Sequence, residues 1–346
     1  MSLLNGLNEK QKQAVCCCDK HVRIIAGAGS GKTRVITTRI AYLIEELGIW
    51  PNRILAITFT NKAAREMKER IETLLDDRAS AVNVSTIHSF CVRLLREDIY
   101  ELKYPRNFTI IDSDDAKSIL KEAYKIYDLD VKQYSYTSML AYISNCKMEF
   151  VSCEHAMKLA HFPKDEAKAN VYAYYQKRLA EMYALDFDDL LLYAYRLLSD
   201  FEHIRYKWQK RFDYLHVDEF QDVDYVQYQI VKLLTRQDAI LCVVGDPDQT
   251  IYTWRGARVD IILNFENDFK NCETIIMNEN YRSTQPILNT ANALIKHNKN
   301  RIDKDLFTNT ESDDLIVHYS ALDDQDEPRW VASQIAKLIH EQQFDM

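Results

Sequence analysis

Short apolar runs alternate with amphipathic segments over the first hundred residues. The apolar runs are residues 22–26, 54–59 and 81–85. Their length is typical of buried strands. Apolar side chains recur at three- and four-residue intervals from Thr33 to Leu47, which predicts a helix. A second helix is expected over residues 62–75, with Asn61 as its N-cap. This alternation predicts an α/β fold with a parallel sheet covered by helices on both faces.

The pattern changes after residue 88, where long helical segments rich in Tyr, Leu, Lys and Glu follow one another. A strand-like run at residues 108–111 is the exception. Strand-like runs return further along the chain, at residues 214–217, 240–244 and 274–277. We therefore expect one sheet domain, formed by residues 1–87 and 213–278, with an inserted helical domain at residues 88–212.

The last part of the chain, residues 279–346, is expected to begin a second sheet domain. Its pattern predicts a helix over 284–297, a strand over 315–319 and a helix over 327–340. These elements are too few for a complete sheet domain, so this part is expected to be truncated.

Charge is unevenly distributed along the chain. The net charge is −8, but residues 1–110 carry 17 Lys and Arg against 12 Asp and Glu, a net of +5. This distribution permits a basic track for DNA without requiring one. No apolar run is long enough to span a bilayer, and the first residues do not look like a signal peptide. A cytoplasmic location is expected.

The run AGAGSGKT, residues 26–33, lies between the first predicted strand and helix. Its three glycines tolerate unusual dihedrals, which would let backbone N–H groups point at a phosphate. Lys32 would then reach the β- and γ-phosphates, and the Thr33 hydroxyl would hold magnesium. The strict pattern has glycine at the first position, where this chain has Ala26. The alternative is a glycine-rich turn without a ligand.

The run HVDEFQD places two acids directly after the predicted strand 214–217. Asp218 could bind magnesium, directly or through water. Glu219 could polarise the attacking water as a general base. Such a pair is weak evidence by itself, but it becomes strong beside a phosphate loop.

Four further side chains are candidates for contacts with a nucleoside triphosphate. Gln249 follows the predicted strand 240–244 and could orient water or sense the γ-phosphate. Arg282 could neutralise charge in the transition state. Tyr281 could stack on the base, and Gln11 could donate to the adenine edge.

Aromatic and cationic residues are interleaved at the predicted strand ends. Phe59, Tyr252 and Trp254 lie there, with Arg255 beside the tryptophan. Stacking faces and cations together favour a sequence-neutral track for single-stranded nucleic acid. The alternative is that Phe59 and Trp254 are core residues. Because Gln249 is five residues from Trp254, loss of the γ-phosphate could move the aromatic pocket.

Taken together, these runs resemble the UvrD/Rep/PcrA-type superfamily 1 DNA helicases over the whole chain. The matching runs are LNEKQ, AGAGSGKTRV, ITFTNKAAREM, VSTIHSF, LDFDDLL, HVDEFQD, VVGDPDQTIYTWRGA and NENYRST. The resemblance implies ATP-driven motors that move 3′ to 5′ on single-stranded DNA and unwind duplex. It implies two RecA-like domains, each a P-loop NTPase sheet with a helical insertion, and ATP and Mg²⁺ bound in the cleft between them.

The resemblance also implies roles for individual residues. The ATP-binding residues are Gln11, Ala26, Gly27, Ala28, Gly29, Ser30, Gly31, Lys32, Thr33, Arg34 and Tyr281. The magnesium residues are Thr33 and Asp218, and the catalytic residues are Glu219, Gln249 and Arg282. The single-stranded DNA residues are Phe59, Asn61, His88, Tyr252, Trp254 and Arg255. Implied partners are single-stranded DNA, junctions of single- and double-stranded DNA, and repair or replication loading proteins.

Family members are much longer, and a second arginine finger of the family lies beyond residue 346. The chain is therefore expected to be an N-terminal fragment that binds nucleotide and single-stranded DNA weakly and unwinds nothing alone. Three alternatives remain open: a helicase subunit of a RecB/AddA-like helicase–nuclease, a nucleotide-gated single-stranded DNA-binding module without motor activity, and a P-loop kinase. The compact insertion disfavours the first, and the aromatic–arginine run disfavours the last.

Overall fold

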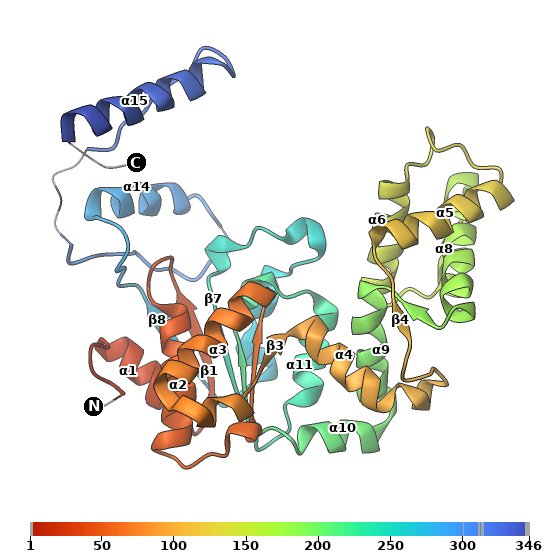
Figure 1. Cartoon of the computed structure of the whole chain (residues 1–346), viewed down its shortest axis with the longest axis horizontal. Coiled ribbons are helices and arrows are strands. Elements are labelled where there is room, and N and C mark those ends of the chain that lie inside the picture. The colour runs from red at the N-terminus through yellow and green to blue at the C-terminus, as the bar shows by residue number, and fades with distance from the viewer. Residues whose placement is uncertain (1–2, 300, 311, 313–314, 343–346) are drawn as a thin grey trace.

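A computed structural model describes residues 3–299, 301–310, 312 and 315–342, and a six-stranded sheet forms its centre (Figure 1). The strands are β1 (His21–Ala26), β2 (Ile54–Thr58), β3 (Asn83–Thr86), β6 (Tyr214–Val217), β7 (Ile240–Gly245) and β8 (Cys272–Met277). Their order is β3-β2-β6-β7-β1-β8, and every pairing is parallel. The predicted α/β class is therefore confirmed, and the carboxyl ends of all six strands meet at one edge.

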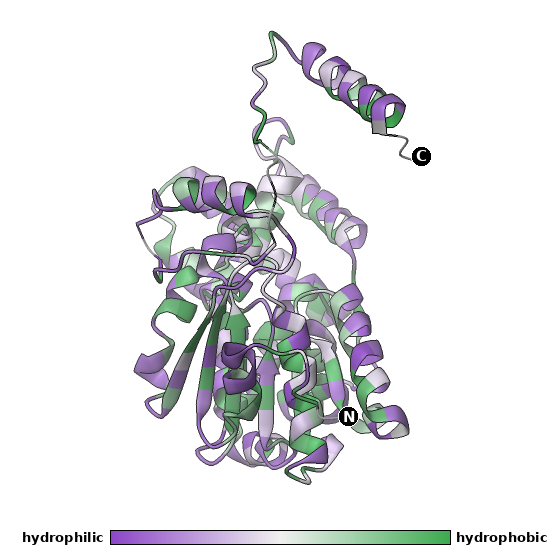
Figure 2. Cartoon of the chain, turned by 90° about the vertical axis from the view of Figure 1, so that its left-hand side faces the viewer, coloured by the Kyte–Doolittle hydropathy of each residue, from purple (hydrophilic) through white to green (hydrophobic). Residues whose placement is uncertain are grey.

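The two faces of the sheet bury different helices, because successive side chains on a strand point to opposite faces. Ile24 of β1 packs into a core with α2 (Lys32–Glu45) and α3 (Asn61–Leu75). Its neighbour Ile25 packs into the opposite core. That core is formed with α4 (Ile87–Asp98), α9 (Phe187–Asp200), α10 (Glu202–Gln209), α11 (Tyr225–Leu234), α12 (Val259–Leu263) and α13 (Phe265–Asp268). Figure 2 shows the apolar strands enclosed between these layers.

A separate helical unit projects from this body (Figure 1). It contains α5 (Ser113–Ile126), α6 (Tyr136–Met148), α7 (Cys153–Leu159) and α8 (Pro163–Glu181), with a two-stranded sheet of β4 (Thr109–Ile110) and β5 (Ala184–Leu185). Its apolar core runs from Ile111 to Ala184 and is distinct from both cores of the sheet. Helices α4, α9 and α10, at the two ends of the predicted insertion, instead share the core of the sheet. We propose the narrower span, 109–185, as the inserted unit.

Two local predictions are wrong. Thr60, not Asn61, is the N-cap of α3: its hydroxyl accepts a hydrogen bond from the Ala63 N–H, and Asn61 is the first helical residue. The strand expected over 315–319 is absent. Leu315 and Val317 are 87% and 71% exposed, because no strand in the described part of the chain lies beside them to pair with.

Three helices complete the fold. They are α1 (Glu9–Cys16), α14 (Gln285–Ile295) and α15 (Asp326–Gln342). Helix α1 packs against α2, and α15 stands away from the sheet in both cartoon views (Figures 1 and 2). Among the described residues, no helix has the length and apolar character needed to cross a membrane.

Candidate nucleotide and DNA site

The glycine-rich loop joins β1 to α2 at the carboxyl edge of the sheet. Gly29 and Gly31 have φ angles of 66° and 84°, in the left-handed region that favours glycine. A Cβ on Gly29 would also lie 2.6 Å from Asn280 Nδ2, so a side chain there has no room. The 14-residue helix α2 begins directly after Gly31. Its free N–H groups and dipole are suited to a phosphate.

Lys32 and Glu219 face each other across this edge. Lys32 Nζ lies 3.1 Å from Glu219 Oε2, and the lysine side chain is 13% exposed. Glu219 has a φ of 50°, a left-handed conformation that is uncommon for a non-glycine residue. This turn directly follows β6 and brings the carboxylate over the phosphate loop. The structure thus brings together the predicted phosphate lysine and the predicted general base.

Asp218, the last residue before that turn, is buried and accepts a hydrogen bond from the Glu219 N–H (3.0 Å). Burial and the neighbouring Glu219 raise the pKa of Asp218 to about 6, while Lys32 opposes the shift. A buried carboxylate with a raised pKa is stabilised in its ionised form by a nearby cation.

These residues fit a magnesium ion bound with a nucleotide. In the described part of the chain, no three His, Cys, Asp or Glu side chains cluster as a metal cage. Mg²⁺ in nucleotide sites needs only one or two protein carboxylates, because phosphates and water complete its shell. Asp218 and the hydroxyl of Thr33, the second residue of α2, are the ligands that this arrangement offers.

The predicted adenine residues lie beside the phosphate loop. Gln11 is buried, and its Nε2 donates to the Ser30 carbonyl at 3.0 Å. The Tyr281 N–H donates to the Gly29 carbonyl at 2.9 Å, and its ring is 55% exposed, so it is free to stack. Asn8 links Gln11 to Tyr281. Its side chain is the N-cap of α1 and accepts a hydrogen bond from the Gln11 N–H, and its Nδ2 donates to the Tyr281 hydroxyl at 2.8 Å.

Asn280 anchors the loop that carries Tyr281 and Arg282. Its Nδ2 donates to the Ala28 carbonyl at 2.6 Å. Its Oδ1 accepts from the N–H groups of Arg282 (2.8 Å) and Ser283 (2.6 Å). The exposed Arg282 is therefore held beside the phosphate loop by backbone contacts. Arg34, predicted to contact ATP, is likewise exposed, on the first turn of α2.

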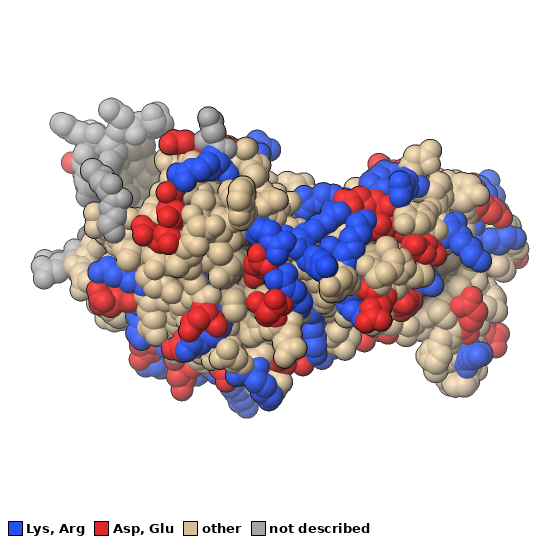
Figure 3. All heavy atoms as spheres, turned by 90° about the horizontal axis from the view of Figure 1, so that it is seen from below, with Lys and Arg blue, Asp and Glu red and all other residues tan. Residues whose placement is uncertain are grey.

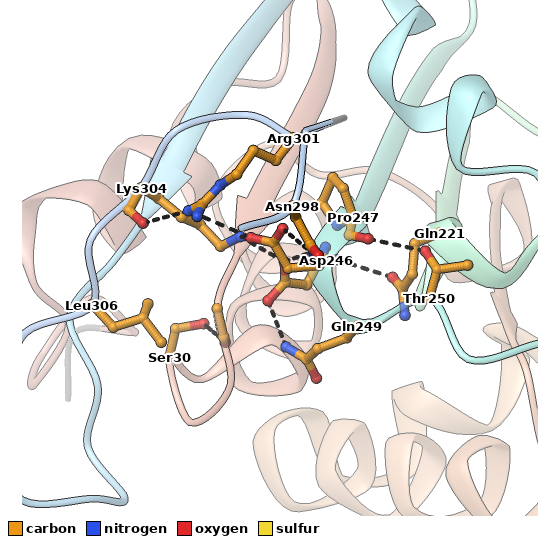
Figure 4. Close-up of polar contacts among 12 residues, drawn as sticks. Ser30, Gln221, Asp246, Pro247, Gln249, Thr250, Asn298, Arg301, Lys304 and Leu306 are labelled. Carbon is orange, nitrogen blue, oxygen red and sulfur yellow. Dashed lines mark hydrogen bonds and ion pairs between the residues drawn. The ribbon is translucent and has the colours of Figure 1, made fainter. Parts of the chain in front are cut away.

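Gln249 lies in the turn after β7, and its side-chain amide is hydrogen-bonded to Asp246. Its Nε2 donates to Asp246 Oδ2 at 2.6 Å (Figure 4). The Asp246 N–H in turn donates to Gln221 Oε1 (2.9 Å), and Gln221 Nε2 donates to Glu219 Oε2 (3.0 Å). A Cβ on Gly245 would lie 2.5 Å from Gln221 Oε1, so glycine permits this approach. A continuous polar chain thus joins Gln249 to Glu219.

The predicted DNA aromatics form one cluster. The ring centroids of Phe59 and Tyr252 are 4.7 Å apart, and those of Tyr252 and Trp254 are 6.3 Å apart. The Arg255 guanidinium lies 4.5 Å from the Trp254 ring centroid. Trp254 is 71% exposed, so the alternative that it is a core residue is wrong. Phe59 is half-buried and belongs to none of the three apolar cores.

The other two DNA candidates lie outside these ring contacts. The ring of His88, in the first turn of α4, packs edge-on against Phe187 with centroids 5.9 Å apart. Burial lowers the pKa of His88, which favours the neutral imidazole. Asn61 is exposed at the start of α3.

Comparison with known proteins decides the family. The profile described as UvrD/REP helicase N-terminal domain matches residues 7–270, and that described as UvrD-like helicase C-terminal domain matches residues 275–346. The chain belongs to the UvrD/REP helicase family. It is 45% identical over 336 residues to proteins named ATP-dependent DNA helicase PcrA from Staphylococcus epidermidis and Staphylococcus aureus. These alignments cover 97% of this chain and 46% of each relative, so the chain spans about half the length of those relatives.

The surface of this UvrD/REP-family chain carries a basic region seen from below (Figure 3). Helix α10 lies on that side in Figure 1. Two cations in and directly after α10 are paired with acids: Lys207 Nζ lies 2.7 Å from Asp98 Oδ1, and Arg211 Nη2 lies 2.6 Å from Glu97 Oε2. Lys210 instead lies over the Tyr206 ring, 4.3 Å from its centroid. Because α10 follows the helical unit and precedes β6, this region lies near the amino ends of the strands, away from the aromatic cluster.

Sequence reasoning missed several residues that shape this helicase-family site. They are Asn8, Gln221, Asp246, Asn280, Lys304 and Leu306. Asn8, Gln221, Asp246 and Asn280 lie within runs that resemble the family, so a polar residue inside those runs was a usable signal. Lys304 and Leu306 lie in a stretch without any local motif.

Proposed function

We propose that this chain is the N-terminal, ATP-hydrolysing part of a DNA helicase that moves 3′ to 5′ on single-stranded DNA. The observation that carries this proposal is the shared edge of the sheet. The ion pair between Lys32 and Glu219 and the cluster of Phe59, Tyr252 and Trp254 both lie where parallel strands end. A triphosphate site and a stacking surface on one rigid edge support a motor rather than a kinase.

The residues of the chain divide the chemical work. The backbone of the loop at Gly29 and Gly31 and the start of α2 would hold the phosphates. Lys32 would leave Glu219 for the β- and γ-phosphates, freeing the carboxylate to accept a proton from the attacking water. Mg²⁺, held by Thr33 and Asp218, would supply charge neutralisation on the phosphates.

Single-stranded DNA would lie on the aromatic cluster, with bases stacked on Trp254 and Tyr252 and phosphates near Arg255. Stacking contributes about 1–3 kcal/mol per base and depends little on base identity. Gln249 precedes this cluster in one continuous turn, and its amide is tied to Glu219 through Asp246 and Gln221. This linkage supports coupling between the γ-phosphate and the DNA track.

We propose that unwinding needs more of the protein than this chain, since the related helicases are about twice as long. The test is ATP hydrolysis by this chain and by a longer protein that contains it, with and without single-stranded DNA, against the variant Lys32→Ala. We expect hydrolysis that DNA stimulates and the variant abolishes. DNA binding that responds to nucleotide without hydrolysis in either protein would instead indicate a nucleotide-gated binding module. Unwinding by the 346-residue chain alone would contradict its role as a part.

A further inference from the structure

A second lysine is buried at the carboxyl edge of the sheet, and the chemistry proposed above gives it no role. Lys304 has a side chain that is 3% exposed, and its Nζ lies 2.6 Å from both Asp246 Oδ1 and Asp248 Oδ2. The two carboxylates are themselves 4% and 6% exposed. Figure 4 shows the Lys304 side chain reaching Asp246. A buried charge is tolerated where it is paired and hydrogen-bonded. This ammonium therefore compensates two acids in the turn that follows β7.

Asp246 divides its carboxylate between this lysine and Gln249. Oδ1 accepts from Lys304 Nζ, and Oδ2 accepts from Gln249 Nε2, both at 2.6 Å. A cation on one oxygen withdraws charge from the other, so Lys304 weakens the hold of Asp246 on the Gln249 amide. The amide must leave Asp246 before it can face a γ-phosphate or a water molecule.

The segment around Lys304 also touches the phosphate loop. A Cβ on Gly27 would lie 2.3 Å from Leu306 Cδ2, so the leucine rests directly on the loop backbone. Leu306 is fixed by Asn292, which donates to its carbonyl (2.8 Å) and accepts from its N–H (3.0 Å). Phe307 then pairs with the loop after β8 through the Asn280 N–H (2.8 Å). Residues 301–308, which we call the strap, thus run from the Gln249 turn across the phosphate loop.

We propose that Lys304 is a positioning residue that sets how readily Gln249 is released from Asp246 to the γ-phosphate. This inference rests on the proposed function. It extends that function by assigning γ-phosphate sensing in part to the strap, which lies within the match to the C-terminal helicase domain. Lys304 itself makes no contact with the reacting atoms in this account.

The proposal predicts a specific loss in the variant Lys304→Met. The uncompensated Asp246 would hold Gln249 more tightly and would repel a γ-phosphate. Affinity for a non-hydrolysable Mg–ATP analogue should fall about tenfold, the scale of one charge-assisted hydrogen bond. Affinity for Mg–ADP, which lacks the γ-phosphate, should stay within about twofold. Lys304→Arg keeps the charge and should recover most of the preference for triphosphate.

Two variants separate positioning from structural support. Asp248→Asn leaves the Lys304 ammonium to Asp246 alone, so Gln249 is released more easily and the preference for triphosphate should rise. Damage to the fold would instead weaken both nucleotides. Lys296→Met is the matched control: Lys296 is 61% exposed and pairs with Asp305 at 3.4 Å, so its variant should bind as the wild type does.

The measurement is fluorescence titration of the full chain with both nucleotides. An unchanged ratio of triphosphate to diphosphate affinity in Lys304→Met, or a parallel loss of both affinities with no rise in Asp248→Asn, overturns the inference. If Lys304→Met does not fold, the direction of change in Asp248→Asn decides. Absence of nucleotide binding in the wild type would contradict the proposed function instead, so the two failures are distinguishable.

Discussion

Glu219 forms an ion pair with Lys32, with 3.1 Å between Glu219 Oε2 and Lys32 Nζ. The predicted general base and the predicted phosphate-binding lysine therefore neutralise each other's charge. The left-handed turn at Glu219 and the start of α2 fix the two side chains from opposite sides of the site. A triphosphate entering the loop competes with Glu219 for Lys32. The same exchange frees the carboxylate to act on water, so binding would prepare the base.

The variant Glu219→Gln should therefore separate binding from chemistry. Hydrolysis should fall about 10²- to 10⁴-fold, the usual contribution of a general base. Affinity for a non-hydrolysable triphosphate should rise, by up to about fivefold, because a partly exposed ion pair no longer competes for Lys32. DNA-stimulated ATPase assays and nucleotide titration measure the two effects.

The matched control is Glu45→Gln, which breaks an ion pair with Arg78 at the other end of α2. It should leave both quantities unchanged. A fall in triphosphate affinity for Glu219→Gln would show that Glu219 supports the site rather than competing within it.

Gly29 and Gly48 offer a paired test of the phosphate loop. Both have left-handed backbones, with φ of 66° and 67°, so alanine at either costs about 1 kcal/mol of folding stability. At Gly29 the added Cβ would also lie 2.6 Å from Asn280 Nδ2 and 2.8 Å from Arg282 Cβ, whereas at Gly48 nothing lies within 4 Å. Gly29→Ala should therefore displace the loop that carries Tyr281 and Arg282.

We expect Gly29→Ala to weaken nucleotide binding at least tenfold, and Gly48→Ala to lower the melting temperature slightly without affecting binding. Thermal unfolding and nucleotide titration of both variants measure these changes. Equal effects of the two variants on binding would indicate that the contact with Asn280 has no part in the site.

The local features of the fold could be predicted from sequence, because they depend on neighbouring residues. The predicted strand 214–217 is reproduced to the residue, and the glycine loop lies where its motif indicated. Contacts that depend on the order of the strands could not be predicted. Asn8 meets Tyr281 across 273 positions in sequence, and Lys304 meets Asp246 across 58, because β8 and the strap return to the first strand.

The two wrong predictions have different causes. Thr60 and Asn61 are both good capping residues, and the extended backbone of Thr60 (φ −124°, ψ 153°) decides between them. The apolar run at 315–319 indicated a strand, but a strand also needs a neighbour, which periodicity does not report. Roles of individual site residues stay predictions that the variants described here test.

Trp254 is the sharpest test of the DNA track. Its side chain is 71% exposed, although burying such a large apolar ring would be favourable. The Arg255 guanidinium lies over the ring. Trp254→Ala should weaken binding of single-stranded oligonucleotides by about five- to 150-fold, equivalent to one stacked base. Fluorescence anisotropy with oligonucleotides of mixed sequence measures it, and the loss should depend little on sequence.

Trp50 provides the control. It is 76% exposed and precedes β2, so it lies at the amino edge of the sheet, away from the aromatic cluster. Trp50→Ala should bind DNA as the wild type does. An equal loss in both variants would remove the reason to place the DNA at the carboxyl edge.

Asp224 should make the stability of the protein depend on pH. Its side chain caps α11 by accepting a hydrogen bond from the Gln227 N–H (2.8 Å). Its backbone forms an isolated antiparallel β-bridge with Ala257, which follows the turn that carries Tyr252 and Trp254 (the aromatic turn). Burial, with a smaller contribution from Asp188, raises its pKa to about 6, above the ordinary value of 3.8. The folded state therefore holds a proton that the unfolded state releases between about pH 4 and pH 6, and stability falls as the pH rises through this window.

Asp224→Asn keeps the cap and removes the titration. Relative to the wild type, its free energy of unfolding should increase by about 2–3 kcal/mol between pH 4 and pH 7, since one pKa unit corresponds to about 1.4 kcal/mol. The control, Asp112→Asn, changes an exposed N-cap whose pKa is lowered by the N–H groups of Asp115 and Asp114, so it should lose stability at neutral pH instead. Urea unfolding at each pH measures both. A difference for Asp224→Asn that stays constant with pH would mean that this carboxylate is ionised throughout, and that the aromatic turn rests on a charged cap.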